Sequence, residues 1–131
     1  MKPNTHLAIN HRLCGCPGDL AEGRATAVLQ TTEELAVDDR GLVHGGFVFG
    51  LADHAAMLAV NDPNVVLGSA ELRFVAPVRA GDLVEARAEV TETKGKKRTV
   101  AVEARVGDRV VLTGTLVAFV LPQHVLDAPG G

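Results

Sequence analysis

Residues 41–60 read GLVHGGFVFGLADHAAMLAV, and this stretch decides the fold. From about Gly46 to Val60 it predicts one helix, because apolar residues appear on every side at helical spacing. Between Phe47 and Val60 only Asp53 and His54 are ionisable, and a helix that is apolar all round is normally a buried one. The helix is expected to end at 61–64, NDPN, because a proline cannot continue the helical hydrogen bonds.

The rest of the chain has the pattern of β-structure. Runs rich in β-branched and apolar residues are separated by short Gly-, Pro- and Asp-containing turns, which predicts antiparallel hairpins between neighbours. The predicted strands cover residues 23–32, 65–75, 82–92, 99–106 and 109–121. One helix can cover a five-stranded sheet only if the sheet curls around it. We therefore expect an α+β fold with a curved antiparallel sheet wrapped around one long central helix.

Length and composition limit the function classes. The 131 residues predict a single domain, 1–131, with an N-terminal extension over 1–20 and a flexible tail over 122–131. The net charge of −3 gives no global attraction for nucleic acid or for an anionic membrane. No apolar run has the length of a signal peptide or a membrane span, so we expect a cytoplasmic protein without nucleic-acid or membrane partners.

The first twenty residues contain a cluster of potential metal ligands. His6, His11, Cys14 and Cys16 form the pattern H-x4-H-x2-C-x-C. This spacing matches no common zinc pattern, and no second pair of cysteines follows. We favour two reduced thiols in a turn over a cramped zinc site, and expect no bound metal.

The last predicted strand indicates self-association. Its segment VVLTGTLVAFVL, residues 110–121, is almost continuously apolar, whereas a strand with one solvated face alternates apolar and polar residues. Its second face needs a cover, and the chain has no further helix to supply one. We therefore expect a homo-oligomer.

Asp53 is the residue in the central helix that needs an explanation. An isolated buried carboxylate is costly and normally becomes protonated or finds a partner. At 100° per residue, Gly46, Gly50, Asp53 and Met57 fall along one stripe of the helix. Each glycine within a helix costs about 1 kcal/mol relative to alanine. Either a small molecule lies along this stripe, or another backbone packs closely against it, and both interpretations stay open.

The His-Gly-Gly at the start of the helix favours the first interpretation. The first N–H groups of a helix have no internal partner, and the helix dipole makes that end partly positive. Without side chains at Gly45 and Gly46, a ligand oxygen can approach these donors closely, as in an oxyanion hole. Together with the carboxylate two turns further on, this suits attack on a polarised carbonyl. The same Gly-Gly pattern also serves as ordinary turn chemistry.

The segment VHGGFVFGLADHAAMLAVN, residues 43–61, resembles the helix signature of the hotdog-fold thioesterases, in particular the branch with the phenylacetyl-CoA-pathway enzymes. That signature reads HGG, several apolar residues and then L-A-D. The stretch AELRFVAPVRAGDLVEARAEV, residues 70–90, resembles the strand-turn-strand of the same family, with its Pro and Gly-Asp. The resemblance covers roughly residues 20–121. It implies the wrapped helix described above, and dimers or tetramers whose active sites are shared between subunits.

The resemblance also implies roles for individual residues. Asp53 would act as nucleophile or general base, the Gly45 N–H would polarise the thioester carbonyl, and His44 would shape the loop. The phenylacetyl-type enzymes have an Asn six residues before the histidine that helps to position the carbonyl, and this chain has Asp38 there. An ionised Asp cannot donate a hydrogen bond, so Asp38 is protonated, serves another purpose, or goes with a different substrate orientation.

Other residues are weaker candidates. The basic turn with Lys96, Lys97 and Arg98 would hold the phosphates of coenzyme A, although exposed charge runs are usually only solvated, which we favour here. His54 is expected to be a core or interface histidine. Ser69 and Glu71 share one face of a predicted strand and are candidates to approach the site.

Three functions compete. The first is an acyl-CoA thioesterase, with coenzyme A as part of the substrate, no other cofactor, and Gly46 among the substrate-binding residues. The second is an acyl-thioester hydratase or dehydratase, but these usually have a Pro near the catalytic histidine, which VHGGF lacks. The third is a non-catalytic acyl-CoA-binding protein; such regulators usually carry a DNA-binding domain, for which the roughly 20 residues before the first strand are too few. We therefore favour the thioesterase.

Overall fold

The central helix is present as predicted. The computed structural model describes residues 1–127, and in it helix α2 extends from Gly45 to Val60 with His44 as the residue that precedes it. It begins one residue earlier than expected. Asn61 ends it in the left-handed conformation (φ 54°), with its N–H donating to the carbonyl of Met57. The NDPN segment therefore stops the helix where the sequence predicts.

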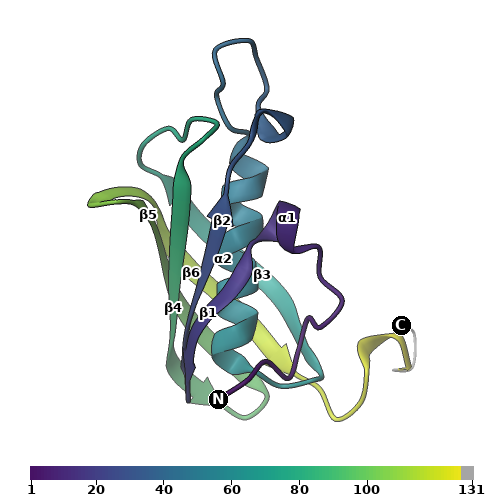
Figure 1. Ribbon diagram of the computed structural model, residues 1–131. Coiled ribbons are helices and arrows are strands. Elements are labelled where there is room, and N and C mark those ends of the chain that lie inside the picture. The colour runs from purple at the N-terminus through teal and green to yellow at the C-terminus, as the bar shows by residue number, and fades with distance from the viewer. Residues whose placement is uncertain (128–131) are drawn as a thin grey trace.

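A single antiparallel sheet wraps around α2 (Figure 1). Its strands are β1 (Cys16–Ala21), β2 (Arg24–Gln30), β3 (Val65–Phe74), β4 (Leu83–Lys94), β5 (Lys97–Val106) and β6 (Arg109–Val120), in the order β1-β2-β4-β5-β6-β3. Short helical turns accompany them: α1 (His11–Cys14), η1 (Glu33–Leu35) and η2 (Val125–Asp127). The α+β architecture with a curved sheet around one long helix is confirmed. Residues 128–131, part of the expected flexible tail, lie outside the described residues.

Two features of the sheet differ from the prediction. The sheet has six strands rather than five, because residues 16–21, CPGDLA, form β1 within the expected N-terminal extension. Proline and glycine remove the usual strand pattern from this segment, but an edge strand tolerates both residues. In addition, β3 pairs with β6 and not with its sequence neighbour β4. The eight residues 75–82 connect β3 at the edge of the sheet to β4 in its middle. The strands β4 and β5, and β5 and β6, form the expected hairpins across two-residue turns.

Small side chains let the sheet close tightly on the helix. Four alanines of the sheet and three of α2 are completely buried. They are Ala27, Ala86, Ala104, Ala118, Ala52, Ala55 and Ala56. Larger residues such as Leu51, Leu58 and Leu116 fill the space between them, so the interior reaches close packing without a single aromatic ring from Tyr or Trp.

The N-terminal segment, residues 1–15, runs alongside α2 (Figure 1). At the end of the helix, the Asn61 side chain accepts from the Asn4 N–H at 2.7 Å and donates to the Lys2 carbonyl at 3.0 Å. At the other end of the segment, Gly15 approaches β2 and α2 so closely that a Cβ would lie 2.5 Å from the Leu51 side chain. Its φ of 89° is a second reason for glycine.

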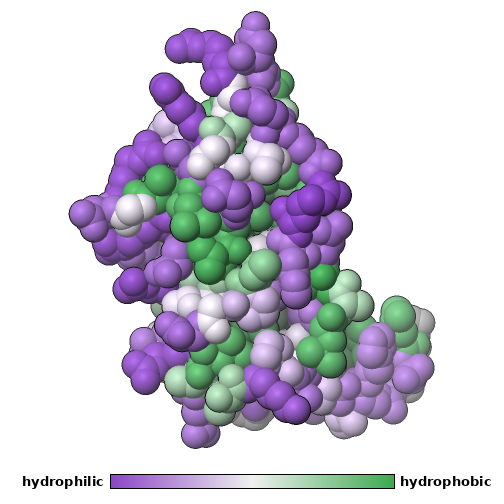
Figure 2. Space-filling model, viewed as in Figure 1, coloured by the Kyte–Doolittle hydropathy of each residue, from purple (hydrophilic) through white to green (hydrophobic). Residues whose placement is uncertain are grey.

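The outer surface is not uniformly polar. Figure 2 shows apolar side chains gathered over the middle of the face seen in Figure 1, with hydrophilic side chains around them. Large apolar side chains that stay well exposed include Phe74, Val75 and Leu83. Within the described residues, no helix is long and apolar enough to cross a membrane.

Candidate functional site

The loop before α2, residues 41–44, is held on both sides by main-chain hydrogen bonds. The Val43 N–H donates to the Val78 carbonyl at 2.9 Å, and the Ala80 N–H donates to the Gly41 carbonyl at 2.8 Å. The His44 N–H donates to the Leu35 carbonyl at 2.9 Å. The loop is therefore fixed between η1 and the turn over residues 78–82, which contains the Gly-Asp of the sequence pattern.

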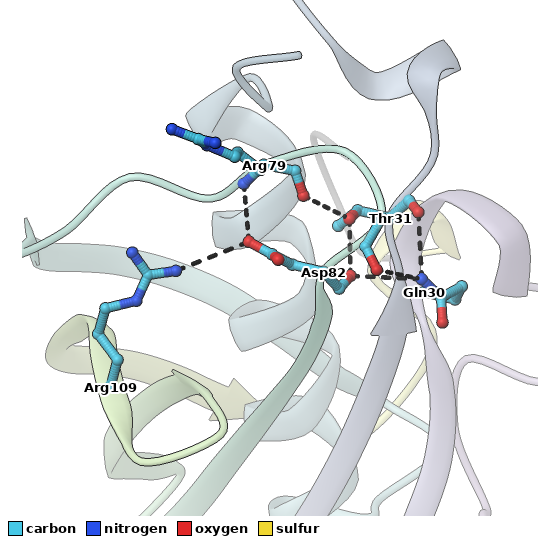
Figure 3. Close-up of polar contacts among 6 residues, drawn as sticks. Gln30, Thr31, Arg79, Asp82 and Arg109 are labelled. Carbon is cyan, nitrogen blue, oxygen red and sulfur yellow. Dashed lines mark hydrogen bonds and ion pairs between the residues drawn. The ribbon is translucent and has the colours of Figure 1, made fainter. Parts of the chain in front are cut away.

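A second group of polar contacts braces that turn (Figure 3). The hydroxyl of Thr31, which is 1% exposed, faces two carbonyls: that of Asp82 at 2.6 Å and that of Arg79 at 3.0 Å. The Asp82 carboxylate accepts the Arg79 N–H at 2.8 Å and forms an ion pair with Arg109 at 3.6 Å. Gln30 donates to the Gly81 carbonyl at 3.0 Å. These bonds fix the backbone that supports the His-Gly-Gly loop.

Asp38 shapes the same loop. Its Oδ1 accepts the N–H groups of Arg40 at 3.0 Å and Leu42 at 3.1 Å, and the residue is exposed. A carboxylate can make both bonds without donating a proton. The structure thus gives Asp38 a task in holding the loop, which is one of the alternatives open after sequence analysis.

The N–H groups at the start of α2 are available. Among residues 1–127, no hydrogen bond uses the N–H of Gly45 or Gly46. The His44 ring lies over Gly46, where a Cβ would be 2.9 Å from its Nε2, and contacts the edge of Phe47 at a centroid distance of 5.9 Å. Gly45 lies against Phe74, whose Cε1 would be 3.3 Å from a Cβ. Two free donors therefore lie between a histidine and a phenylalanine.

Asp53 has the character expected of a functional carboxylate. It is partly buried, and its Oδ1 is fully buried without a hydrogen-bond partner among the described residues. Burial raises the pKa of Asp53 from an ordinary value of 3.8 to about 6. A buried carboxylate whose pKa lies near neutrality is suited to accept and return a proton.

The stripe that contains Asp53 is open at its middle. A Cβ at Gly50 would meet nothing within 4 Å, whereas Met57, the last member of the stripe, is buried. Asp53 lies eight residues after Gly45, which is about 12 Å along the helix axis. The open side of α2 therefore has the free donors at one end and the carboxylate two turns away.

His54 belongs to the core, as expected. It is 1% exposed, and its Nδ1 lies 3.2 Å from the carbonyl of Cys14, the geometry of an N–H donating to that oxygen. The rings of His6 and His11 stack near it at centroid distances of 6.2 and 6.4 Å. Burial lowers the pKa of His54 and of His6. Across residues 1–127, no three His, Cys, Asp or Glu side chains are placed to hold a metal ion.

The basic turn lies at the other end of the sheet. Within one chain, Lys96 and Lys97 pair with the end of β6, which in turn pairs with Val65 just after the C-terminal end of α2. Lys96, Lys97 and Arg98 therefore lie far from Gly45 in the same chain. Ser69 and Glu71 face away from α2, because Glu71 pairs with Thr115 on the face opposite to the buried Leu116.

Sequence reasoning did not single out Phe74 or Thr31. Phe74 is one of several apolar residues in a predicted strand, and its contact with Gly45 depends on the pairing of β3 with β6. Thr31 ends a strand with no charge or motif to mark it. The Gly-Asp of the turn was a usable signal for the brace, because Gly-Asp sequences favour tight turns with side-chain acceptors.

Comparisons with known proteins agree with this architecture. A family model described as the thioesterase superfamily matches residues 40–113. A protein named methylthioribose-1-phosphate isomerase from Aquifex aeolicus is 51% identical over 87% of this chain and 25% of its own length. A protein named transcription factor FapR from Caldanaerobacter subterraneus is 26% identical over 79% of this chain and 52% of its own length. The chain therefore spans about a quarter and about half of these relatives.

Solved structures give the same result. An uncharacterized protein from Pyrococcus horikoshii is 50% identical, with a TM-score of 0.96 over 97% of this chain and 98% of its own. A mutant of the phenylacetic acid degradation protein PaaI from Thermus thermophilus is 32% identical, with a TM-score of 0.76 over 83% of this chain and 95% of its own. With the family model covering more than half of the sequence, the chain belongs to the thioesterase superfamily and has its hotdog fold.

Proposed function

We propose that this protein hydrolyses acyl-CoA thioesters to a free acid and coenzyme A. The observation that carries this proposal is the state of Asp53. Among residues 1–127 its buried Oδ1 has no hydrogen-bond partner and the first two N–H groups of its helix are free, and its pKa is raised to about 6. Membership of the thioesterase superfamily supports the reaction class.

In the proposed reaction, the Gly45 N–H donates to the carbonyl oxygen of the thioester and stabilises the negative charge that develops there. Water attacks the carbonyl carbon while the Asp53 carboxylate takes its proton. The C–S bond then breaks, and the departing thiolate receives a proton. In the second form, the carboxylate itself attacks, and water hydrolyses the resulting anhydride. Both forms need Asp53 ionised, and both give the same products.

We infer that each site is shared between two chains. A carbonyl hydrogen-bonded to Gly45 is about 3 Å from that nitrogen, whereas Asp53 of the same chain is about 12 Å further along the helix. Two helices lying antiparallel across a two-fold axis bring Gly45 of one chain opposite Asp53 of the other. The open stripe at Gly50 leaves room for such an approach, and the free edge of β3 offers ten residues for antiparallel pairing with its copy.

The same two-fold pairing bears on the basic turn. An antiparallel copy brings its own basic turn to the end of the assembly where the first chain has Gly45. Lys96, Lys97 and Arg98 of the copy would then face the phosphates of a bound coenzyme A. Replacing Lys97 by Ala should raise KM for a CoA thioester and leave an N-acetylcysteamine thioester unchanged, because the short thioester has no phosphate. Arg87→Gln, at an exposed arginine in the middle of β4, is the matched control and should change neither KM.

A second function is favoured by one observation. The similarity to proteins named transcription factor FapR, a name that denotes a regulator and not an enzyme, favours a module that binds its ligand without hydrolysing it. The two functions share the fold and differ in whether Asp53 acts chemically.

The first test is thiol release from a panel of acetyl-, hexanoyl-, phenylacetyl-, benzoyl- and palmitoyl-CoA, with binding of each measured by calorimetry. The thioesterase proposal expects turnover of at least one ester. Binding without any turnover would contradict it and favour the binding module. Light scattering on the same sample tests the shared site, which requires at least a dimer.

A further inference from the structure

We propose that Phe74 is the acyl-binding wall of the site, and that it selects thioesters with an apolar acyl body over acetyl thioesters. This inference rests on the proposed function and names the part of the substrate that the site recognises, the acyl group. It starts from one contact, that of Phe74 with Gly45.

Phe74 occupies the space beside the carbonyl-binding donor. Three atoms of its ring, Cε1, Cδ1 and Cζ, would lie 3.3, 3.6 and 3.8 Å from a Cβ at Gly45. The ring remains 57% exposed, so one part packs on Gly45 and the rest is free. A carbonyl bound to the Gly45 N–H is about 3 Å from that nitrogen, so the exposed part of the ring is within reach of one of its two substituents.

The inner face of β3 shows where an acyl chain would continue. Phe74, Leu72 and Ala70 alternate along this edge strand and pair with residues 112, 114 and 116 of β6. Both Leu112 and Leu116 are completely buried, so their partners share the face that looks toward α2. This track carries no charged side chain.

A glycine of β6 shapes this track. A Cβ at Gly114 would lie 2.5 Å from the Leu72 side chain, so glycine at that position lets Leu72 lie flat on β6. On α2, a Cβ at Gly50 would meet nothing within 4 Å, so the helix also has open space beside it. An apolar chain therefore finds apolar atoms along the strand.

The other substituent of the thioester, the pantetheine arm, fits this track poorly. It contains two amides, which lose hydrogen bonds to water beside apolar side chains. The charged neighbours in β3, Glu71 and Arg73, lie on the opposite face of the strand. We therefore assign the ring and the track to the acyl group, and the exposed side at Gly46 to the arm.

The test compares kcat/KM of the wild-type protein with Phe74→Ala, Phe74→Leu and Val75→Ala on acetyl-, hexanoyl- and phenylacetyl-CoA. Phe74→Ala should lose about tenfold or more on the two larger esters and less than about threefold on acetyl-CoA, because removal of apolar contacts discriminates by roughly this much. Phe74→Leu should recover most of the hexanoyl-CoA rate. Val75→Ala is the matched control, since Val75 is a neighbouring apolar residue that is 59% exposed, and should change no ratio.

Equal losses on all three esters, or no loss, would overturn the assignment. If Phe74 only stabilised a subunit interface, light scattering would show a change of mass and all rates would fall together, which also overturns it. A binding measurement distinguishes failure of the acyl-wall proposal from failure of the hydrolysis proposal. In the Asp53→Asn background, hexanoyl-CoA should bind at least about tenfold more tightly than coenzyme A, and Phe74→Ala should remove most of that difference. Absence of the difference would refute the acyl wall even in a protein that hydrolyses nothing.

Discussion

Replacing Asp53 with Asn should stabilise the protein at neutral pH. Burial raises the pKa of Asp53 from 3.8 to about 6. The folded protein therefore holds this proton up to about pH 6, whereas the unfolded chain releases it near pH 4. As pH rises between these values, stability falls, because the folded state binds more protons. A shift of two pKa units lowers the free energy of unfolding by about 3 kcal/mol above pH 6. The Asn variant should avoid this loss because its side chain carries no charge.

The assay is thermal unfolding of both proteins at pH 7.5 and at pH 4, at one protein concentration because subunit association also affects the midpoint. At pH 7.5 the variant should melt roughly 10 °C higher, and at pH 4 the difference should be small, since both side chains are then largely neutral. Asp39→Asn is the matched control, because Asp39 is exposed, and its melting temperature should not change at either pH. An equal or lower melting temperature for Asp53→Asn at pH 7.5 would refute the claim that burial of this carboxylate is costly.

Three further predictions follow from the same residues. Thioester hydrolysis should rise with pH through about 6 and then level off, because Asp53 acts in its ionised form; a rate independent of pH between 5 and 7 would contradict this role. His54→Gln should reduce the loss of stability that the protein shows below pH 6.5, because the pKa of His54 is lowered in the folded state and the unfolded state therefore binds the extra proton. Unfolding midpoints of both proteins at pH 7.5 and pH 5 measure this loss. An unchanged pH dependence would count against a buried neutral histidine. Gly50→Ala should lower kcat/KM at least several-fold by filling the open stripe, even though alanine favours the helix by about 1 kcal/mol; unchanged kinetics would show that neither substrate nor partner uses that space.

The central helix and its acid could be predicted because they depend on local patterns. Apolar residues at every helical position require burial, and a lone carboxylate among them is conspicuous whatever surrounds it. The His-Gly-Gly marked the free donors in the same way, because unpaired N–H groups at a helix start follow from helix geometry alone.

Features that depend on distant pairing were not predictable in this way. The segment with Pro17 and Gly18 carries no strand signal, and becomes β1 only because β2 offers it a free edge. The pairing of β3 with β6 likewise decides that Phe74 lies on Gly45 while Glu71 faces away. A strand alternates its side chains, but the sequence does not say which face meets the helix when both faces carry apolar residues.

Asp38 shows a third case, in which the structure gives a local task to a residue whose role the sequence left open. Its carboxylate accepts two N–H groups of the loop, those of Arg40 and Leu42, so the folded loop uses an acceptor at this position. The sequence could identify the substitution, but the direction of these donors became visible only in the folded loop.

The central claim is that the Asp53 carboxylate carries out thioester hydrolysis. The most direct test measures kcat of Asp53→Asn on the best ester of the panel, together with its dissociation constant. We predict a fall of at least about 100-fold in kcat with the affinity for the ester retained, since Asn keeps the shape but can neither accept the proton nor attack. A variant that retains the wild-type kcat would contradict the account.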